Sequence, residues 1–184
     1  QRHAHSYFPK YLYRDDQRFE LPGNDGNTKV EGKGAIYAQN LIADETLKFV
    51  RANADRPFFL YYSITLPHGT FQIDDQGIYQ DKPWTTQQKN YAAMVTRMDR
   101  SIGRIMAKLK ELKLENDTLV LFTSDNGPTF NGGTDSAFFE SAGPLRGLKM
   151  SLYEGGIRAP MIARWPGRIE PGSETDQTGA AWDV

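Results

Sequence analysis

Residues 119–133 read LVLFTSDNGPTFNGG, an apolar run that stops abruptly in a carboxylate, an amide, a glycine and a proline. Leu119–Thr123 is short and rich in branched and aromatic residues, which is typical of a buried strand. Asp125 and Asn126 follow it closely, and their side-chain oxygens suit a hard cation such as calcium or magnesium. A simple turn is the alternative, because Asp, Asn, Gly and Pro all favour turns. The position at the end of a buried strand favours the metal site.

Two further elements precede this run along the chain. Phe58–Ile64, FFLYYSI, is an unbroken apolar and aromatic segment, which predicts a strand buried on both faces. Thr85 and Gln88 have the spacing of a capping box and predict the start of a helix. Apolar residues then recur at helical spacing, at Tyr91, Met94, Val95, Met98, Ile102, Ile105, Met106, Leu109 and Leu112. We interpret the methionines of this stripe as core filler.

The remaining segments complete an alternating pattern. Residues 1–39 are rich in Gly, Asn, Asp, Tyr and Pro, which indicates loops and a short hairpin. Asn40–Asn53 has apolar residues at helical spacing, and Met161–Trp165 predicts a third strand. Strands and helices in alternation predict an α/β domain whose helices cover a largely parallel sheet. We therefore divide the chain into a loop-rich segment, 1–39, and an α/β core, 40–184, of the same domain.

Composition places few limits on partners. The chain has 184 residues, is 39% hydrophobic and 24% charged, and carries a net charge of −1, so it gives no reason to propose nucleic acid or an anionic membrane as partner. The absence of cysteine excludes disulfides, thiolate–metal sites and a cysteine nucleophile within these residues. The first residues contain no signal peptide, and no apolar stretch approaches the roughly 20 residues that span a bilayer. Because Gln1 is not an initiator methionine and Val184 ends an apolar patch, we expect an excerpt of a longer protein.

His68 and Asp125 follow two different predicted strands. If the long helix between those strands is a crossover, the strands run parallel and their carboxyl ends meet at one edge of the sheet. Ligands collect at that edge in α/β sheets. The order of elements therefore predicts a shared site for these two side chains.

His68 and Lys149 are candidates for contact with an anion. A histidine can hydrogen-bond an anionic ester or protonate a leaving group near neutral pH. Lys149 lies among glycines, which let the backbone approach a ligand closely and leave the ammonium free to meet an oxyanion. Each has a plain alternative, a structural histidine and an exposed lysine. His3 and His5, in the loop-like first segment, are weaker candidates.

Other charged and aromatic residues give weaker evidence of a functional role. Arg146 and Arg158 are cationic, but Arg158 has a structural alternative, in which it holds its loop through Glu154 or Asp135. The segment GIYQDKPW, residues 77–84, offers rings that could stack on a sugar or arene, although ordinary packing is favoured. The chain contains no HExxH motif, P-loop or G-x-S-x-G elbow.

Three blocks of sequence together resemble the sulfatase family. They are TLPHG (65–69) after FFLYYSI, FTSDNGP (122–128), and LRGLKMSLYEGGIRAP (145–160), and they occur in the family's order. The helical segment 94–112 is also similar to that family. AHSYFPKYLYRDD (4–16) is more loosely similar to bacterial carbohydrate sulfatases. The pattern K-x-x-x-YEGG-x-R is the most specific of these features.

The resemblance implies an alkaline-phosphatase-like α/β fold, with helices on both faces of a mixed, mostly parallel sheet, and hydrolysis of aryl or carbohydrate sulfate monoesters. It implies that Asp125 and Asn126 are ligands of a divalent cation, calcium rather than magnesium. It also implies that His68 and Lys149 contact the sulfate, and that His68 or Lys149 helps to protonate the leaving oxygen. These residue types suit the chemistry, because a cation and fixed positive charges stabilise negative charge that develops on oxygens. Export to the periplasm or secretion is the family's usual setting.

The family's reactive group is missing from the chain. Formylglycine, made from Cys or Ser in a C/S-x-P/A-x-R motif, is expected in the parent protein, but no such motif occurs here. The family's early Asp-Asp pair and its G-K-x-H segment are also absent from the matched region. We therefore expect no turnover from this polypeptide alone. Two alternatives stay open: a phosphomonoester or diester hydrolase of the same superfamily, and a non-catalytic sulfatase-like domain that binds glycans or partners.

Overall fold

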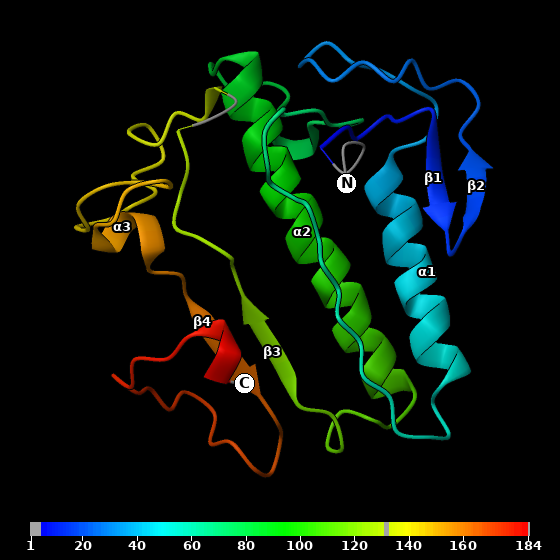
Figure 1. Cartoon of the computed structure of the whole chain (residues 1–184), viewed down its shortest axis with the longest axis vertical. Coiled ribbons are helices and arrows are strands. Elements are labelled where there is room, and N and C mark those ends of the chain that lie inside the picture. Colours follow the sequence, from blue (N-terminus) through cyan, green and yellow to red (C-terminus); the bar gives the residue numbers. More distant parts are fainter. Residues whose placement is uncertain (1–4, 131–132, 184) are drawn as a thin grey trace.

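The structure is a computed structural model that describes residues 5–130 and 133–183 of the chain. Two long helices, α1 (Ala38–Ala52) and α2 (Thr86–Glu111), pack side by side and run in the same direction (Figure 1). Arg104 on α2 and Asp44 on α1 form an ion pair of 2.6 Å across them. The structure thus confirms both helices that the apolar spacing predicts.

The start of α2 is fixed by its own sequence. The Gln88 amide donates to Thr85 Oγ1 at 3.2 Å, and the Thr85 amide donates to Gln88 Oε1 at 2.9 Å. This reciprocal pair satisfies two amides that a helix N-terminus leaves without partners. Along the helix, the predicted stripe is buried or half-buried throughout, and Met94 is fully buried. The capping box and the interpretation of these methionines as core filler are both confirmed.

Two antiparallel strand pairs flank the helix pair, and only the first of them is a hairpin. β1 (Tyr11–Arg14) pairs with β2 (Gln17–Glu20), which confirms a short hairpin in the first segment. β3 (Val120–Thr123) pairs with β4 (Met161–Arg164), close to where the sequence predicts strands. The predicted burial of the first of these strands is wrong: β3 alternates between half-buried and exposed residues, as a strand covered on one face does, and β4 is exposed. In Figure 1 the β1–β2 pair lies beyond α1, and the β3–β4 pair lies on the opposite side, beyond α2.

The predicted strand Phe58–Ile64 is not formed. Within residues 5–130 and 133–183 both sheets are two-stranded and antiparallel, so the described residues contain no parallel pair. The segment alternates in burial like a strand, with Phe59 86% and Tyr61 80% exposed and their neighbours half-buried. A ladder needs a partner at hydrogen-bonding distance as well as strand-forming residues, and the described chain supplies none.

One core joins the first segment to the rest of the chain. Its buried members come from three parts of the chain: the first 39 residues, the segment between α1 and α2, and α2 itself. They are Tyr7, Phe8, Tyr37, Leu66, Phe71 and Met94. A single turn of helix, α3 (Glu154–Ile157), lies outside this core, and short 3-10 turns form at Gly77–Tyr79 and Ala181–Asp183. No helix among the described residues is both long and apolar enough to cross a membrane.

Candidate active site

His68 sits in the turn that ends the extended segment, half-buried and held through its backbone. Its amide donates to Thr65 O at 2.8 Å, and its carbonyl accepts a 2.6 Å hydrogen bond from the Tyr7 hydroxyl. The ring atom Nδ1 lies 2.5 Å from Gly69 O. A carbonyl only accepts, so Nδ1 is the donor, and in the imidazolium form the proton on Nε2 gives the ring a second donor. Nε2 is therefore the atom available to meet an anion.

Tyr7 fastens the N-terminal segment to the His68 turn. The residue is fully buried, its amide donates to Gln72 Oε1 at 3.0 Å, and its hydroxyl also lies 3.3 Å from Thr65 O. Burial raises the pKa of the Tyr7 hydroxyl well above its ordinary value, so the group stays a neutral donor. These hydrogen bonds, rather than a helix or sheet, hold the N-terminal segment against the His68 turn.

His5 lies directly against His68 as a result. The two rings are stacked, with centroids 4.2 Å apart and planes 17° apart. The pKa of His5 is lowered, first by desolvation and then by the positive charges of His68 and Lys149. The positive charge of Lys149 thus acts on the His5 ring, which stacks on His68. His3, the other weak candidate, lies outside the described residues.

Asp125 and Asn126 occupy the loop that leaves β3. Asp125 is exposed and Asn126 is half-buried. The Asn126 amide nitrogen donates to Gly127 O at 3.1 Å, which leaves its Oδ1 as an acceptor. Both residues therefore present oxygens, the donor type that calcium prefers. Among residues 5–130 and 133–183, no group of three or more His, Cys, Asp or Glu side chains is placed to hold a metal ion, so these residues fit only part of a calcium shell.

Backbone hydrogen bonds interlock this loop with the segment that contains Lys149. The Lys149 amide donates to Pro128 O at 2.7 Å, and the Gly127 amide donates to Gly156 O at 3.0 Å. A Cβ at Gly127 would lie 2.1 Å from Gly155 O. Glycine is required at this contact because the two backbones approach too closely for any side chain.

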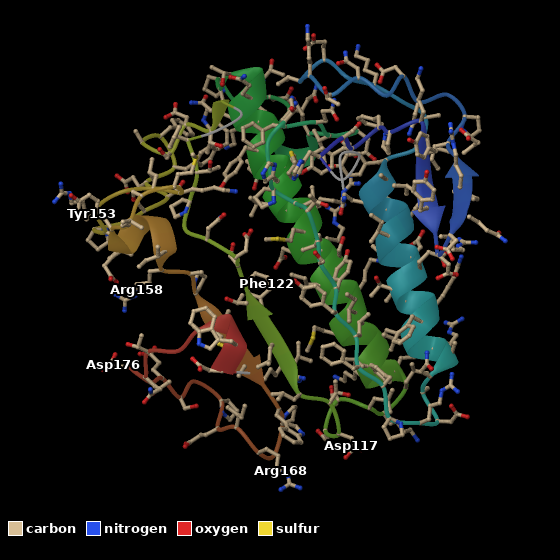
Figure 2. The ribbon with its side chains drawn as sticks, in the orientation of Figure 1. Asp117, Phe122, Tyr153, Arg158, Arg168 and Asp176 are labelled. Atoms are coloured by element: carbon tan, nitrogen blue, oxygen red, sulfur yellow. The ribbon has the colours of Figure 1, made fainter. Side chains whose placement is uncertain are left out.

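The two arginines near this segment face other groups. The Arg158 guanidinium pairs with Glu154 at 3.6 Å, as its structural alternative predicts, and Arg146 covers the Tyr153 ring at 3.7 Å. Figure 2 places Tyr153 and Arg158 on the outer flank by α3. Both cations therefore have partners at this flank.

The aromatic residues of the 77–84 segment pack within the protein. Tyr79 stacks on Trp84 with centroids 5.8 Å apart, and Trp84 meets Phe138 edge-on at 5.2 Å. The Tyr79 hydroxyl forms a 3.0 Å hydrogen bond with Thr96 Oγ1. Packing, the favoured interpretation of these rings, is what the structure shows.

The structure therefore arranges the predicted residues in two linked groups. Asp125, Asn126 and Lys149 belong to one interlocked pair of loops. His5 and His68 form the other group, and the charge of Lys149 lowers the pKa of His5. The structure places His5, one of the two weaker histidine candidates, against His68, and the segment that carries it is held by Tyr7, which the sequence patterns do not single out. The only sequence signal for either was the loosely similar block 4–16.

Comparisons with known proteins agree with the resemblance carried by the sequence blocks 65–69, 122–128 and 145–160. The family model for Sulfatase matches residues 4–183. The N-acetylgalactosamine-6-sulfatase of Canis lupus familiaris is 36% identical over 155 residues, which cover 82% of this chain and 28% of that protein. The N-acetylgalactosamine-6-O-sulfatase of Bacteroides thetaiotaomicron is 31% identical over 159 residues, 78% of this chain and 29% of that protein.

A solved structure shares the fold. The crystal structure of Ps i-CgsB in complex with k-i-k-neocarrahexaose is 31% identical, with a TM-score of 0.62, over 74% of this chain and 30% of that one. The chain thus spans less than a third of the length of each of these proteins. The family match, in contrast, runs over nearly all of the chain. The chain belongs to the sulfatase family.

Proposed function

We propose that this chain forms the part of a sulfuric ester hydrolase that grips the sulfate group of a carbohydrate sulfate ester and assists the leaving oxygen. The stack of His5 on His68, together with the lowering of the His5 pKa by the charge of Lys149, is the observation that supports this most directly. The related proteins named above as galactosamine sulfatases, and the neighbour bound to an oligosaccharide, support a sugar as the esterified alcohol. Aryl sulfates are the second substrate class within this proposal.

Lys149 would hold a sulfate oxygen, since an ammonium is a compact positive charge. His68 would face the ester through Nε2, because its Nδ1 is committed to Gly69 O. During hydrolysis the S–O bond to the sugar breaks, and the leaving oxygen takes a proton that His68 or Lys149 can supply. The arrangement thus combines charge stabilisation with general acid catalysis.

Asp125 and Asn126 would hold calcium, with magnesium less favoured, and the ion would supply charge stabilisation at the sulfate oxygens. Among the described residues no cluster of three or more His, Cys, Asp or Glu side chains accompanies them, whereas calcium takes roughly six to eight oxygens. A C/S-x-P/A-x-R motif is not present in the chain, and formylglycine would supply the oxygen that attacks sulfur. We therefore propose that the chain works within a longer, exported polypeptide with an alkaline-phosphatase-like fold, and that the 184-residue chain alone releases no sulfate.

The test is sulfate release by the full-length protein from 6-sulfated N-acetylgalactosamine and an aryl sulfate, with an aryl phosphate in parallel. Replacing His68 or Lys149 with alanine should lower kcat/KM by roughly 10²- to 10⁴-fold, the usual effect of losing a general acid or a charge-stabilising donor. Arg158→Ala is the matched control, because that cation pairs with Glu154 on the outer flank. Faster turnover of the phosphate would favour the phosphohydrolase alternative. Tight sulfate-ester binding without turnover would favour a binding domain.

A further inference from the structure

His68 is held at three places, its backbone carbonyl, one edge of its ring and one face of its ring, and the contact at the face has no assigned role. The carbonyl of His68 accepts from Tyr7 at 2.6 Å, and its Nδ1 donates to Gly69 O at 2.5 Å. These bonds fix the backbone and one edge of the ring. The face of the ring is covered by His5, with centroids 4.2 Å apart and planes only 17° apart.

A histidine ring needs such a cover to keep a single orientation. The χ2 torsion of histidine is broad, so one hydrogen bond at an edge allows the ring to rock about it. A ring packed against one face removes that freedom without occupying Nε2. His5 therefore restricts the motion that would move Nε2 relative to a bound ester.

His5 is delivered to this position by a well-anchored stretch of chain. Residues 6–9 are all buried, although His5 itself is exposed. The Tyr7 amide donates to Gln72 Oε1 at 3.0 Å, and the Tyr7 carbonyl accepts from the Ala38 amide at 2.9 Å. The stack is thus supported by buried bonds immediately beside it.

We propose that His5 is a positioning residue for His68, whose ring it holds by face-to-face stacking so that Nε2 points at the sulfate ester. This inference rests on the proposed function. A histidine suits the task because its pKa is lowered by desolvation and by the charges of His68 and Lys149, so the covering ring stays largely neutral beside those cations.

The first test compares His5→Phe with His5→Ala in the full-length protein. Phenylalanine retains a flat ring but has no nitrogen, and alanine removes the cover. We expect His5→Ala to lower kcat by roughly 10- to 100-fold with KM changed by less than about 2-fold, as for a slightly misplaced catalytic group, and His5→Phe to restore most of kcat. An equal loss in both variants with a raised KM would mean that His5 binds substrate directly and would overturn the proposal. An unchanged kcat in His5→Ala would overturn it as well.

The second test needs no catalysis. In the full-length protein with ¹⁵N-labelled histidine, at a pH where the His68 ring is neutral, the ring nitrogen shifts of His68 report whether Nδ1 carries the proton. We expect one Nδ1–H tautomer in the wild type and in His5→Phe, and an averaged signal in His5→Ala at an unchanged melting temperature. The same tautomer in all three proteins would refute the positioning role. If the full-length wild type hydrolyses no sulfate ester, the proposed function fails, and this experiment still decides whether His5 orders His68.

Discussion

The backbone amide of Lys149 donates a 2.7 Å hydrogen bond to the carbonyl oxygen of Pro128. This bond joins the segment that bears the site's lysine to the loop that bears Asp125 and Asn126. Gly127 makes the junction possible, because a Cβ there would meet the Gly155 and Gly156 backbones, while a Cβ at Gly155 or Gly156 would meet the backbone of residues 146–151 in their own segment. The geometry of the candidate site is therefore set by backbone contacts between two loops.

Gly127→Ala should disrupt this junction. The new methyl group would lie 2.1 Å from Gly155 O, a backbone atom that cannot move aside without shifting its loop. We expect a loss of about 1–3 kcal/mol in the free energy of unfolding, the usual cost of overpacking, measured by urea denaturation. In the full-length protein, kcat/KM should fall together with stability, since Lys149 would move with the loop.

Gly103→Ala is the matched control for this substitution. Gly103 lies inside α2 and has nothing within 4 Å of the position of a Cβ. Alanine at a helix interior is favoured over glycine by roughly 0.5–1 kcal/mol, so this variant should be more stable than the wild type. Equal changes in the two variants would show that the close approach at Gly127 is not what matters.

Tyr7→Phe should destabilise the His68 turn. The substitution removes the hydroxyl that donates to His68 O at 2.6 Å and leaves that carbonyl without this partner. We expect a loss of about 1–3 kcal/mol in the free energy of unfolding. Tyr79→Phe, which removes a hydroxyl bonded to Thr96 in a half-buried position, should cost less. A larger effect at Tyr79 would contradict the role given to Tyr7.

Local sequence patterns were enough to predict the helices. The capping box of Thr85 and Gln88 and the apolar spacing of α2 are properties of neighbouring residues, and the structure contains both. The strand prediction for Phe58–Ile64 was wrong because a strand also needs a hydrogen-bonding partner from another part of the chain. Its residues suit a strand and alternate in burial, but no other described segment pairs with them.

The candidate site was partly predictable for the same reason. Asp125, Asn126 and Lys149 lie in compact motifs whose composition indicates ligand contact. The stacking of His5 on His68 was not predictable, because it arises from tertiary packing. Tyr7 and Gln72 bring that segment to His68, and no short pattern around His5 announces it.

Calcium should stabilise the full-length protein through Asp125. A ligand that binds only the folded state at 100 times its Kd adds about 2.7 kcal/mol, which appears as a rise in melting temperature. Asp125→Ala should abolish this calcium-dependent rise, because it removes a charged oxygen ligand. Asp117→Ala is the control, since Asp117 lies on the loop before β3, far from α3 (Figure 2). A rise that persists in Asp125→Ala would place the ion elsewhere.

Lys149→Met should raise the pKa of His5. Desolvation, the charge of His68 and the charge of Lys149 lower that pKa in this order, so removing the ammonium should bring it closer to the ordinary 6.5 without restoring it fully. Because the folded-state pKa lies below 6.5, the unfolded chain binds more protons, and His5 makes the protein less stable as the pH falls below about 6.5. Lys149→Met should weaken this pH dependence.

The His5 ring proton shift, followed by NMR across the titration, measures the change directly. Lys110→Met is the control, because that lysine lies in the last turn of α2 and is not among the causes of the shift. An unchanged His5 pKa in Lys149→Met would separate the lysine from the histidines and remove the main support for the proposed sulfate site.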